Sequence, residues 1–115
     1  MADGSAVVEA HVAAFNAQDI DALMAGFCDD ASWVTGTDVV PTSELRAFFT
    51  AAFEHLTPRL SVERVIDGGD AVAAQMRETW SHEGESRSAS IIGVYDVSAG
   101  LIRRGKIYRE GSADA

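Results

Sequence analysis

The opening of the chain carries apolar residues at the three- and four-residue spacing typical of amphipathic helices. Two apolar stripes follow one another, separated at residues 16–19. The first contains Val7, Val8, Val12 and Phe15 with His11 beside it, and the second contains Ile20, Leu23, Met24 and Phe27. Asp19 precedes the second stripe, where a carboxylate caps a helix by accepting a backbone N–H. We therefore predict two short helices, followed by a strand over residues 31–35.

A third apolar stripe lies between Pro41 and Pro58, after a segment at residues 36–42 that we predict to be a loop. Its members recur at helical spacing and are Leu45, Phe48, Phe49, Ala52, Phe53 and Leu56. Proline does not continue a helix, because it lacks the backbone donor and its ring clashes with the preceding turn. The pattern predicts a third helix that ends before Pro58.

From residue 60 onward the spacing of apolar residues changes to two, which is typical of strands with one buried face. Glycine-containing turns at 67–70, 83–85 and 98–100 separate predicted strands over 60–66, 71–82, 87–97 and 101–110. Helices followed by antiparallel strands indicate the α+β class. Because each helix has one apolar stripe to bury, we predict a curved antiparallel sheet wrapped around three N-terminal helices. The 115 residues suit a single domain, residues 1–115.

Composition and charge exclude several classes of partner. The chain is 47% hydrophobic and 23% charged, which is typical of soluble globular proteins, and its net charge of −9 disfavours nucleic acids and anionic membranes. No apolar run reaches membrane-spanning length, and residues 1–4 lack the pattern of a signal peptide, so we expect a cytoplasmic protein. The single cysteine, Cys28, cannot form an internal disulfide, and three scattered histidines give no reason to expect a metal.

Five segments, together with the order of elements, carry a resemblance to a known family. They are AAFNAQDIDAL at 13–23, DDA at 29–31, LRAFF at 45–49, GDAVAA at 69–74 and AGLI at 99–102. The chain resembles the SnoaL-like group of the nuclear-transport-factor-2-like superfamily along essentially its whole length. Relatives include ketosteroid isomerases, limonene-type and polyether epoxide hydrolases and polyketide cyclases. The resemblance implies a cone with a blind apolar pocket, a homodimer and, as in most of these enzymes, no cofactor; it specifies architecture better than reaction.

The resemblance to the isomerases implies only an incomplete version of their active site in this chain. His11 stands where those enzymes keep a tyrosine that donates a hydrogen bond to an enolate oxygen, and imidazole can fill that role. Thr35 stands at the position of their general-base aspartate, and Gly93 lies close to that of their second acid. Both acids are absent, which argues against this chemistry in its usual form. The polyether epoxide hydrolases also use the aspartate of the first strand, so Thr35 argues against their reaction too.

Carried over to the limonene-type epoxide hydrolases, the resemblance points to the second half of the chain. Their aspartate–arginine–aspartate relay places Glu78 as the acid and Glu110 as the base, with Met76 where the arginine belongs. Arg77 is adjacent but is expected on the opposite face, because strand side chains alternate. Two carboxylates in an apolar pocket split their pKa values, which provides one acid and one base near neutral pH. The alternatives are that Glu110 is simply solvated and that Glu78 pairs with an arginine on a neighbouring strand.

Candidate substrate-binding residues flank these carboxylates. Trp80 shares its strand face with Glu78 and Met76, and Trp33 is a candidate for the core or the pocket lining. If Glu110 faces the pocket, then Arg104, Lys106 and Tyr108 share that face and suit an acidic or phenolate-like substrate. The alternative is that the last strand is solvated or lies at a dimer edge.

We therefore predict a cofactor-independent enzyme that uses acid–base chemistry on an apolar or polycyclic substrate. Epoxide hydrolysis and polyketide-type cyclisation or isomerisation both fit, with Glu110 as base, Glu78 as acid and His11 as donor to oxygen. The alternative is a non-catalytic binding protein or dimeric scaffold of the same fold. A pocket lined by all three residues favours the enzyme.

Overall fold

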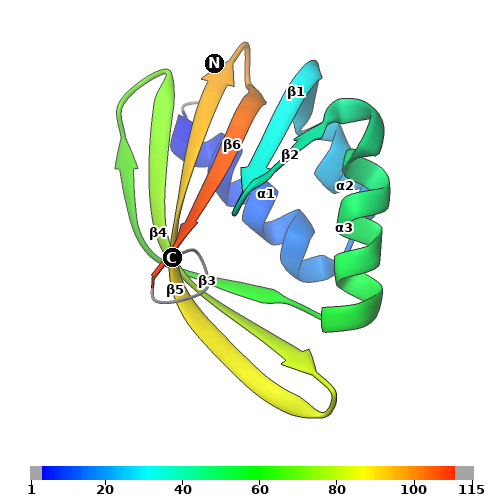
Figure 1. Cartoon of the computed structure of the whole chain (residues 1–115). Helices are drawn as coiled ribbons and strands as arrows, with labels where there is room; N and C mark the ends of the chain where they lie inside the picture. The colour runs from blue at the N-terminus through cyan, green and yellow to red at the C-terminus, as the bar shows by residue number, and fades with distance from the viewer. Residues whose placement is uncertain (1–3, 111–115) are drawn as a thin grey trace.

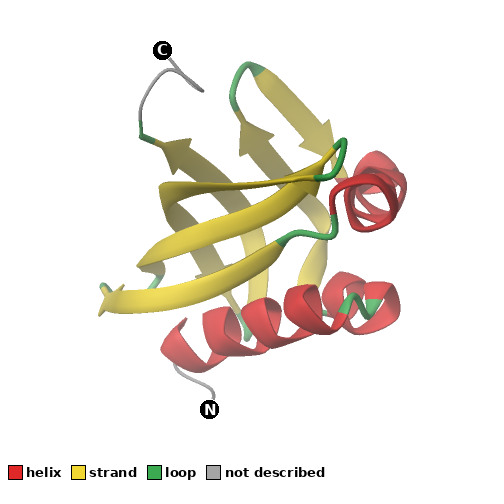
Figure 2. Cartoon of the chain, turned by 90° about the horizontal axis from the view of Figure 1, so that it is seen from below, coloured by secondary structure: helices red, strands yellow, loops and turns green. Residues whose placement is uncertain are grey.

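Helices pack in the hollow of one curved sheet in the computed structural model, which describes residues 4–110 (Figures 1 and 2). The elements in chain order are α1 (Gly4–Ala17), α2 (Ile20–Ala25), β1 (Phe27–Thr35), β2 (Asp38–Pro41), α3 (Thr42–Leu56), β3 (Arg59–Asp67), β4 (Ala71–His82), β5 (Glu85–Ser98) and β6 (Leu101–Arg109). The predicted α+β architecture is confirmed. Asp19 caps α2 as expected, because its side chain accepts the Ala22 N–H at 3.1 Å.

The six strands form a single sheet in the order β2-β1-β6-β5-β4-β3. Neighbouring strands are antiparallel except β1 and β6, which pair in parallel, so the predicted antiparallel sheet has one parallel step. The segment predicted as a loop contains β2, which pairs with β1 through Val34 and Val39. Gly36, with φ of 56°, provides the tight turn between them, and glycine adopts this backbone region without steric cost.

The core lies between the helices and the concave face of the sheet. Its fully buried large side chains come from all three helices and from β4, β5 and β6: Val8, Leu23, Leu45, Phe49, Val72, Met76, Tyr95 and Ile102. The predicted stripe of α1 is buried along its length, as the spacing of its apolar residues requires. No helix among residues 4–110 is long and apolar enough to cross a membrane.

Asn16 ties the end of α1 to the start of β3. Its side-chain amide donates to the Leu60 carbonyl oxygen at 2.9 Å and its oxygen accepts the Leu60 N–H at 2.7 Å. The amide thus pairs with Leu60 as a neighbouring strand would, and Leu60 lies in the wall of the pocket described below.

We expect Asn16→Ala to lower the free energy of unfolding by about 2 kcal/mol, because two partly buried backbone groups of Leu60 lose their partners. Urea denaturation measures the effect. Glu9→Ala is the matched control, since Glu9 is exposed on the same helix and its loss is expected to stay within about 0.5 kcal/mol. Equal stabilities of the two variants would contradict the role given to Asn16.

Candidate active site

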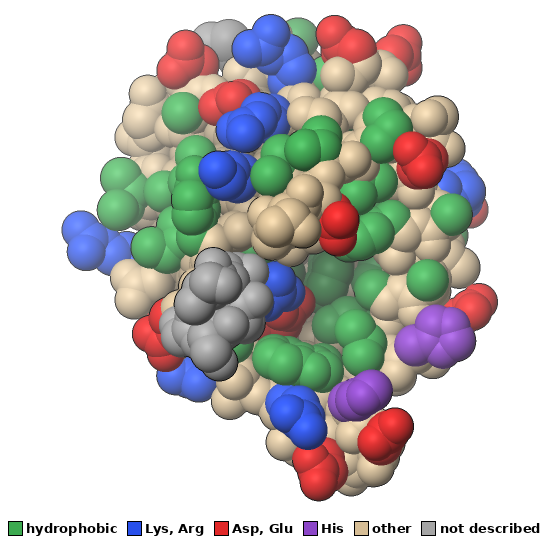
Figure 3. Space-filling model, viewed as in Figure 1, with side chains coloured by type: hydrophobic (Ala, Val, Ile, Leu, Met, Phe, Trp, Pro, Cys, Tyr) green, Lys and Arg blue, Asp and Glu red, His purple; other side chains and the backbone are tan. Residues whose placement is uncertain are grey.

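A pocket of about 320 Å³ lies between α1, α3, the start of β3 and the concave faces of β1, β4, β5 and β6. Figure 3 shows a hollow with apolar walls in which an acidic and a basic side chain lie close together. Its apolar lining is Phe15, Trp33, Phe48, Phe49, Ala52, Leu56, Pro58, Leu60, Trp80, Ile91, Tyr95 and Ile107. The remaining lining residues are His11, Thr35, Glu78 and Arg109. An apolar pocket with few converging polar groups is the usual form of a small-molecule site.

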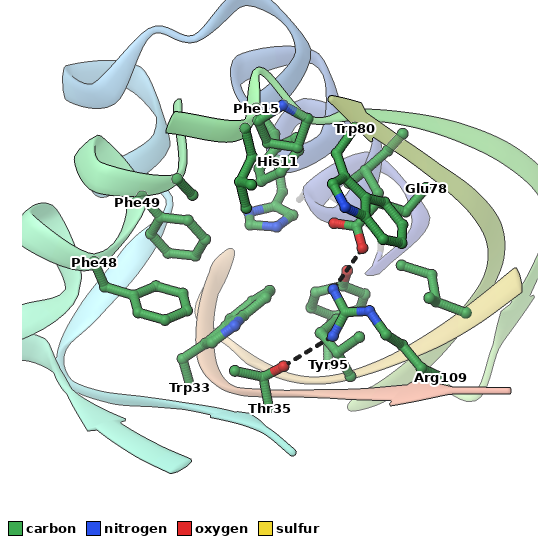
Figure 4. A pocket seen from close by; sticks show the side chains of 16 residues that line it. His11, Phe15, Trp33, Thr35, Phe48, Phe49, Glu78, Trp80, Tyr95 and Arg109 are labelled. Carbon is green, nitrogen blue, oxygen red and sulfur yellow. Dashed lines mark hydrogen bonds and ion pairs between the residues drawn. The ribbon is translucent and has the colours of Figure 1, made fainter. Parts of the chain in front are cut away.

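A carboxylate and an arginine meet on one side of this pocket (Figure 4). Arg109 Nη2 lies 2.5 Å from Glu78 Oε1, and Arg109 Nη1 donates to Thr35 Oγ1 at 3.2 Å. The Glu78 side chain is only 12% exposed and that of Arg109 24%, so solvent screens this pair weakly. Arg109 therefore holds the Glu78 carboxylate in a defined position, while Thr35 orients the guanidinium.

His11 and Tyr95 supply two neutral polar groups to the inner wall. Both residues are buried, with ring centroids 5.4 Å apart, and both nitrogens of His11 and the Tyr95 hydroxyl have no hydrogen-bond partner in the described part of the chain. Burial lowers the pKa of His11 to about 4, so the imidazole is neutral at pH 7. Burial, and then the charge of Glu78, raise the pKa of Tyr95, so its hydroxyl stays protonated.

These unpartnered atoms are unusual, because buried polar groups are nearly always hydrogen-bonded. The residues that carry these atoms line an apolar pocket, and a ligand oxygen placed against the atoms would accept from the Tyr95 O–H and from whichever His11 nitrogen carries the proton. The pocket thus combines one carboxylate with neutral donors.

The Tyr95 ring fills the space next to Gly93, the position that the resemblance places close to the second acid of the isomerases. A Cβ atom at Gly93 would lie 2.5 Å from the Tyr95 hydroxyl and 2.7 Å from its ring atoms, well inside van der Waals contact. The tyrosine ring therefore occupies the space that a side chain at position 93 would need. The Tyr95 hydroxyl, from two residues further along β5, lies in that space.

Four of the predicted site residues line the pocket: His11, Trp33, Glu78 and Trp80. Met76 does not, and the expectation that it contacts substrate is corrected. It lies on the same face of β4 as Glu78, two residues earlier in the strand, where its side chain is fully buried in the core. The arginine that pairs with Glu78 is Arg109 on β6, which the sequence analysis did not identify.

The predicted orientation of the last strand is also corrected. Gly105, Ile107 and Arg109 face the concave side, and the alternation of side chains places Arg104, Lys106, Tyr108 and Glu110 on the other face. Glu110 is exposed and outside the pocket, and Lys106 lies over the Tyr108 ring at 4.8 Å. Ile107 could have indicated the correct orientation of β6, because an apolar side chain two residues before Arg109 lies on the same face as Arg109 and is expected to be buried.

No group of three or more histidine, cysteine, aspartate or glutamate side chains within residues 4–110 is arranged to hold a metal ion.

The family model for the SnoaL-like domain matches residues 8–105, and the chain belongs to this family. No curated protein matches the chain significantly.

Solved structures share the fold at low sequence identity. An LEH-like epoxide hydrolase of M. tuberculosis aligns with a TM-score of 0.83 and 19% identity, over 90% of this chain and 80% of that one. A candidate polyketide cyclase of Pseudomonas putida aligns with a TM-score of 0.88 and 20% identity, over 99% of this chain and 96% of that one. An NTF2-like protein of Burkholderia thailandensis aligns with a TM-score of 0.84 and 22% identity, over 96% of this chain and 92% of that one. These similarities establish the fold, while the reaction has to be argued from the pocket.

Proposed function

We propose that this protein is a cofactor-independent enzyme that removes a proton from a carbon next to a carbonyl group in a small apolar ketone. The outcome is a shift of a double bond or an aldol-type ring closure. One observation carries the proposal: the Glu78–Arg109 pair and the unpartnered donors His11 and Tyr95 line the same apolar pocket. Abstraction of such a proton needs one positioned base and neutral donors at the carbonyl oxygen.

Each polar group then has one task. The Glu78 carboxylate takes the proton, and the electron pair of the broken C–H bond moves through the new C=C bond to the carbonyl oxygen. The Tyr95 hydroxyl and a His11 N–H donate hydrogen bonds to that oxygen as its charge develops. Protonated Glu78 returns the proton at a different carbon, or the enolate attacks a second carbonyl carbon and protonated Glu78 gives its proton to the alkoxide that forms there. Arg109 and Thr35 keep the carboxylate in position throughout.

The test uses a small cyclic ketone whose double bond lies one position out of conjugation. We expect the purified protein to move the double bond into conjugation, which ultraviolet absorbance reports. Failure with a panel of such ketones that demonstrably bind in the pocket would overturn the isomerase proposal. Binding without any turnover would favour the non-catalytic alternative.

Epoxide hydrolysis is the second candidate, favoured by the contact between Glu78 and Arg109 beside the Tyr95 hydroxyl. In that reaction Glu78 would activate water, and Tyr95 would give its proton to the opening epoxide oxygen. Glu78 is the sole carboxylate among the described residues that line the pocket, so one half of a two-carboxylate relay is missing. Conversion of a small cyclic epoxide to a diol, without ketone isomerisation, would replace the first proposal with this one.

We also infer that the protein is a homodimer through the convex face of the sheet. Four exposed large apolar side chains belong to this face, Val39, Ile66, Ile92 and Tyr108. A row of paired residues crosses all six strands on it: Val39, Val34, Lys106, Val94, Ala73 and Ile66. The same face carries Arg104 and Lys106 as well as Asp96 and Glu110, so a second copy related by a two-fold axis offers charges of both signs.

Light scattering after gel filtration tests this inference. We expect a mass of two chains at micromolar concentration, and one chain for Ile92→Glu, which puts a charge into the apolar face. Thr79→Glu, at an exposed position away from the apolar row, serves as the control and is expected to remain dimeric. A monomeric wild-type protein would contradict the inference.

A further inference from the structure

Gly105 lies beneath an aromatic ring at the inner end of the pocket. A Cβ atom at Gly105 would be 2.6 Å from Cε3 and Cζ3 of Trp33. Carbon atoms in contact are normally about 3.5–4.0 Å apart, so the Trp33 ring occupies space that a side chain at position 105 would fill. Gly93 makes room for Tyr95 in the same manner, as described above.

These two glycines and two rings form a connected unit. Gly105 on β6 pairs with Trp33 on β1 and with Tyr95 on β5, so the three residues form one row across the sheet. The Trp33 and Tyr95 ring centroids are 6.2 Å apart, and the His11 ring lies 5.5 Å from the first and 5.4 Å from the second. Figure 4 shows these side chains around the space that Phe48 and Phe49 border from α3. The three rings close the inner end of the pocket.

The remaining space corresponds to a small ligand. An apolar cavity of about 150 Å³ holds one benzene molecule. The pocket measures about 320 Å³, roughly twice that volume, which corresponds to about thirteen ring carbons, more than two fused rings contain and fewer than three contain. A compound with four fused rings has about sixteen ring carbons and would leave the excess outside, beside the charged Glu78–Arg109 pair.

We propose that Trp33 and Tyr95, seated over Gly105 and Gly93, set the depth of the pocket and restrict its ligands to one- and two-ring compounds. This inference narrows the substrate class of the proposed function. It depends on the proposed function only for the reaction that the bound compound undergoes. The size limit itself concerns binding. The polycyclic substrates considered from the sequence lie outside this limit.

A series of aromatic alcohols with one hydroxyl group each tests the size limit without any turnover. Phenol, naphthol, phenanthrol and hydroxypyrene contain one to four rings, and their fluorescence or calorimetry gives Kd. We expect about a tenfold gain in affinity from phenol to naphthol, since the second ring is buried, and no further gain for the larger members. A steady gain up to four rings would overturn the proposal.

Two substitutions move the limit in opposite directions. Trp33→Leu deepens the pocket, and we expect the affinity for phenanthrol relative to naphthol to rise about tenfold. Gly105→Ala pushes the Trp33 ring into the pocket, and we expect naphthol binding to fall about tenfold while phenol binding holds.

Gly26→Ala is the matched control, because its new methyl group meets only the Leu23 carbonyl oxygen, at 3.4 Å. Circular dichroism establishes that each variant is folded. If Gly105→Ala does not fold, Trp33→Leu still decides the matter, because an unchanged phenanthrol-to-naphthol ratio in that variant contradicts the proposal. Inactive protein with the expected ring-size limit would refute the proposed reaction and leave this inference standing.

Discussion

Glu78→Gln is expected to lower kcat/KM for the ketone substrate by about 10²- to 10⁴-fold while leaving the fold intact. Glutamine is nearly isosteric with glutamate and its oxygen still accepts from Arg109, but it cannot take a proton from carbon. The measurement is initial rate against substrate concentration, with Kd for a non-reacting aromatic alcohol measured in parallel. The kcat value carries the loss, and Kd for the alcohol changes little.

Glu110→Gln is the matched control, because it makes the same chemical change at an exposed position outside the pocket. We expect this variant to retain wild-type activity. The reverse result, activity retained in Glu78→Gln and lost in Glu110→Gln, would return the chemistry to the last strand and refute the site described here.

The second large effect is on stability in mild acid. Because burial lowers the pKa of His11 from 6.5 to about 4, the unfolded chain binds a proton at this residue below pH 6.5 that the folded chain does not. His11 therefore has almost no effect on stability above pH 7, and stability is lost as pH falls from 6.5 toward 4. We expect this residue alone to remove about 2 kcal/mol of unfolding free energy between pH 7 and pH 5.

Urea denaturation of wild type and His11→Leu at both pH values isolates this contribution. The loss between pH 7 and pH 5 is expected to be about 2 kcal/mol smaller in the variant, since leucine has nothing to protonate. His82→Leu is the control, because His82 is exposed at the end of β4, and its pH dependence should match wild type. An equal loss in wild type and His11→Leu would show that His11 is not buried in neutral form.

Much of the fold follows from the spacing of apolar residues. The stripe of α1 is buried as predicted, because Val8, Val12 and Phe15 recur with the period of a helix. The strand β2 was missed, since four residues at a sheet edge contain too little alternation to be distinguished from a loop. Phe27 was assigned to a helix because its spacing from Leu23 fits one, but its backbone begins β1.

The candidate site was harder to predict than the fold. His11 and Glu78 were both predicted because the resemblance placed them. Arg109 was missed because the orientation of β6 was guessed from Glu110, and a single-residue change of parity exchanges the two faces of a strand. No sequence pattern shows that the Tyr95 ring fills the space over Gly93 or how large the remaining pocket is, since both depend on contacts between strands.

Hydrogen exchange at carbon tests the central claim most directly. A two-ring ketone is incubated with the protein in D₂O, and NMR follows the signals of the hydrogens next to the carbonyl group. We expect these signals to disappear with wild-type protein and with Glu110→Gln, and to decay only at the uncatalysed rate with Glu78→Gln. Exchange by Glu78→Gln at the wild-type rate, or no exchange by wild-type protein that binds the ketone, would contradict the claim.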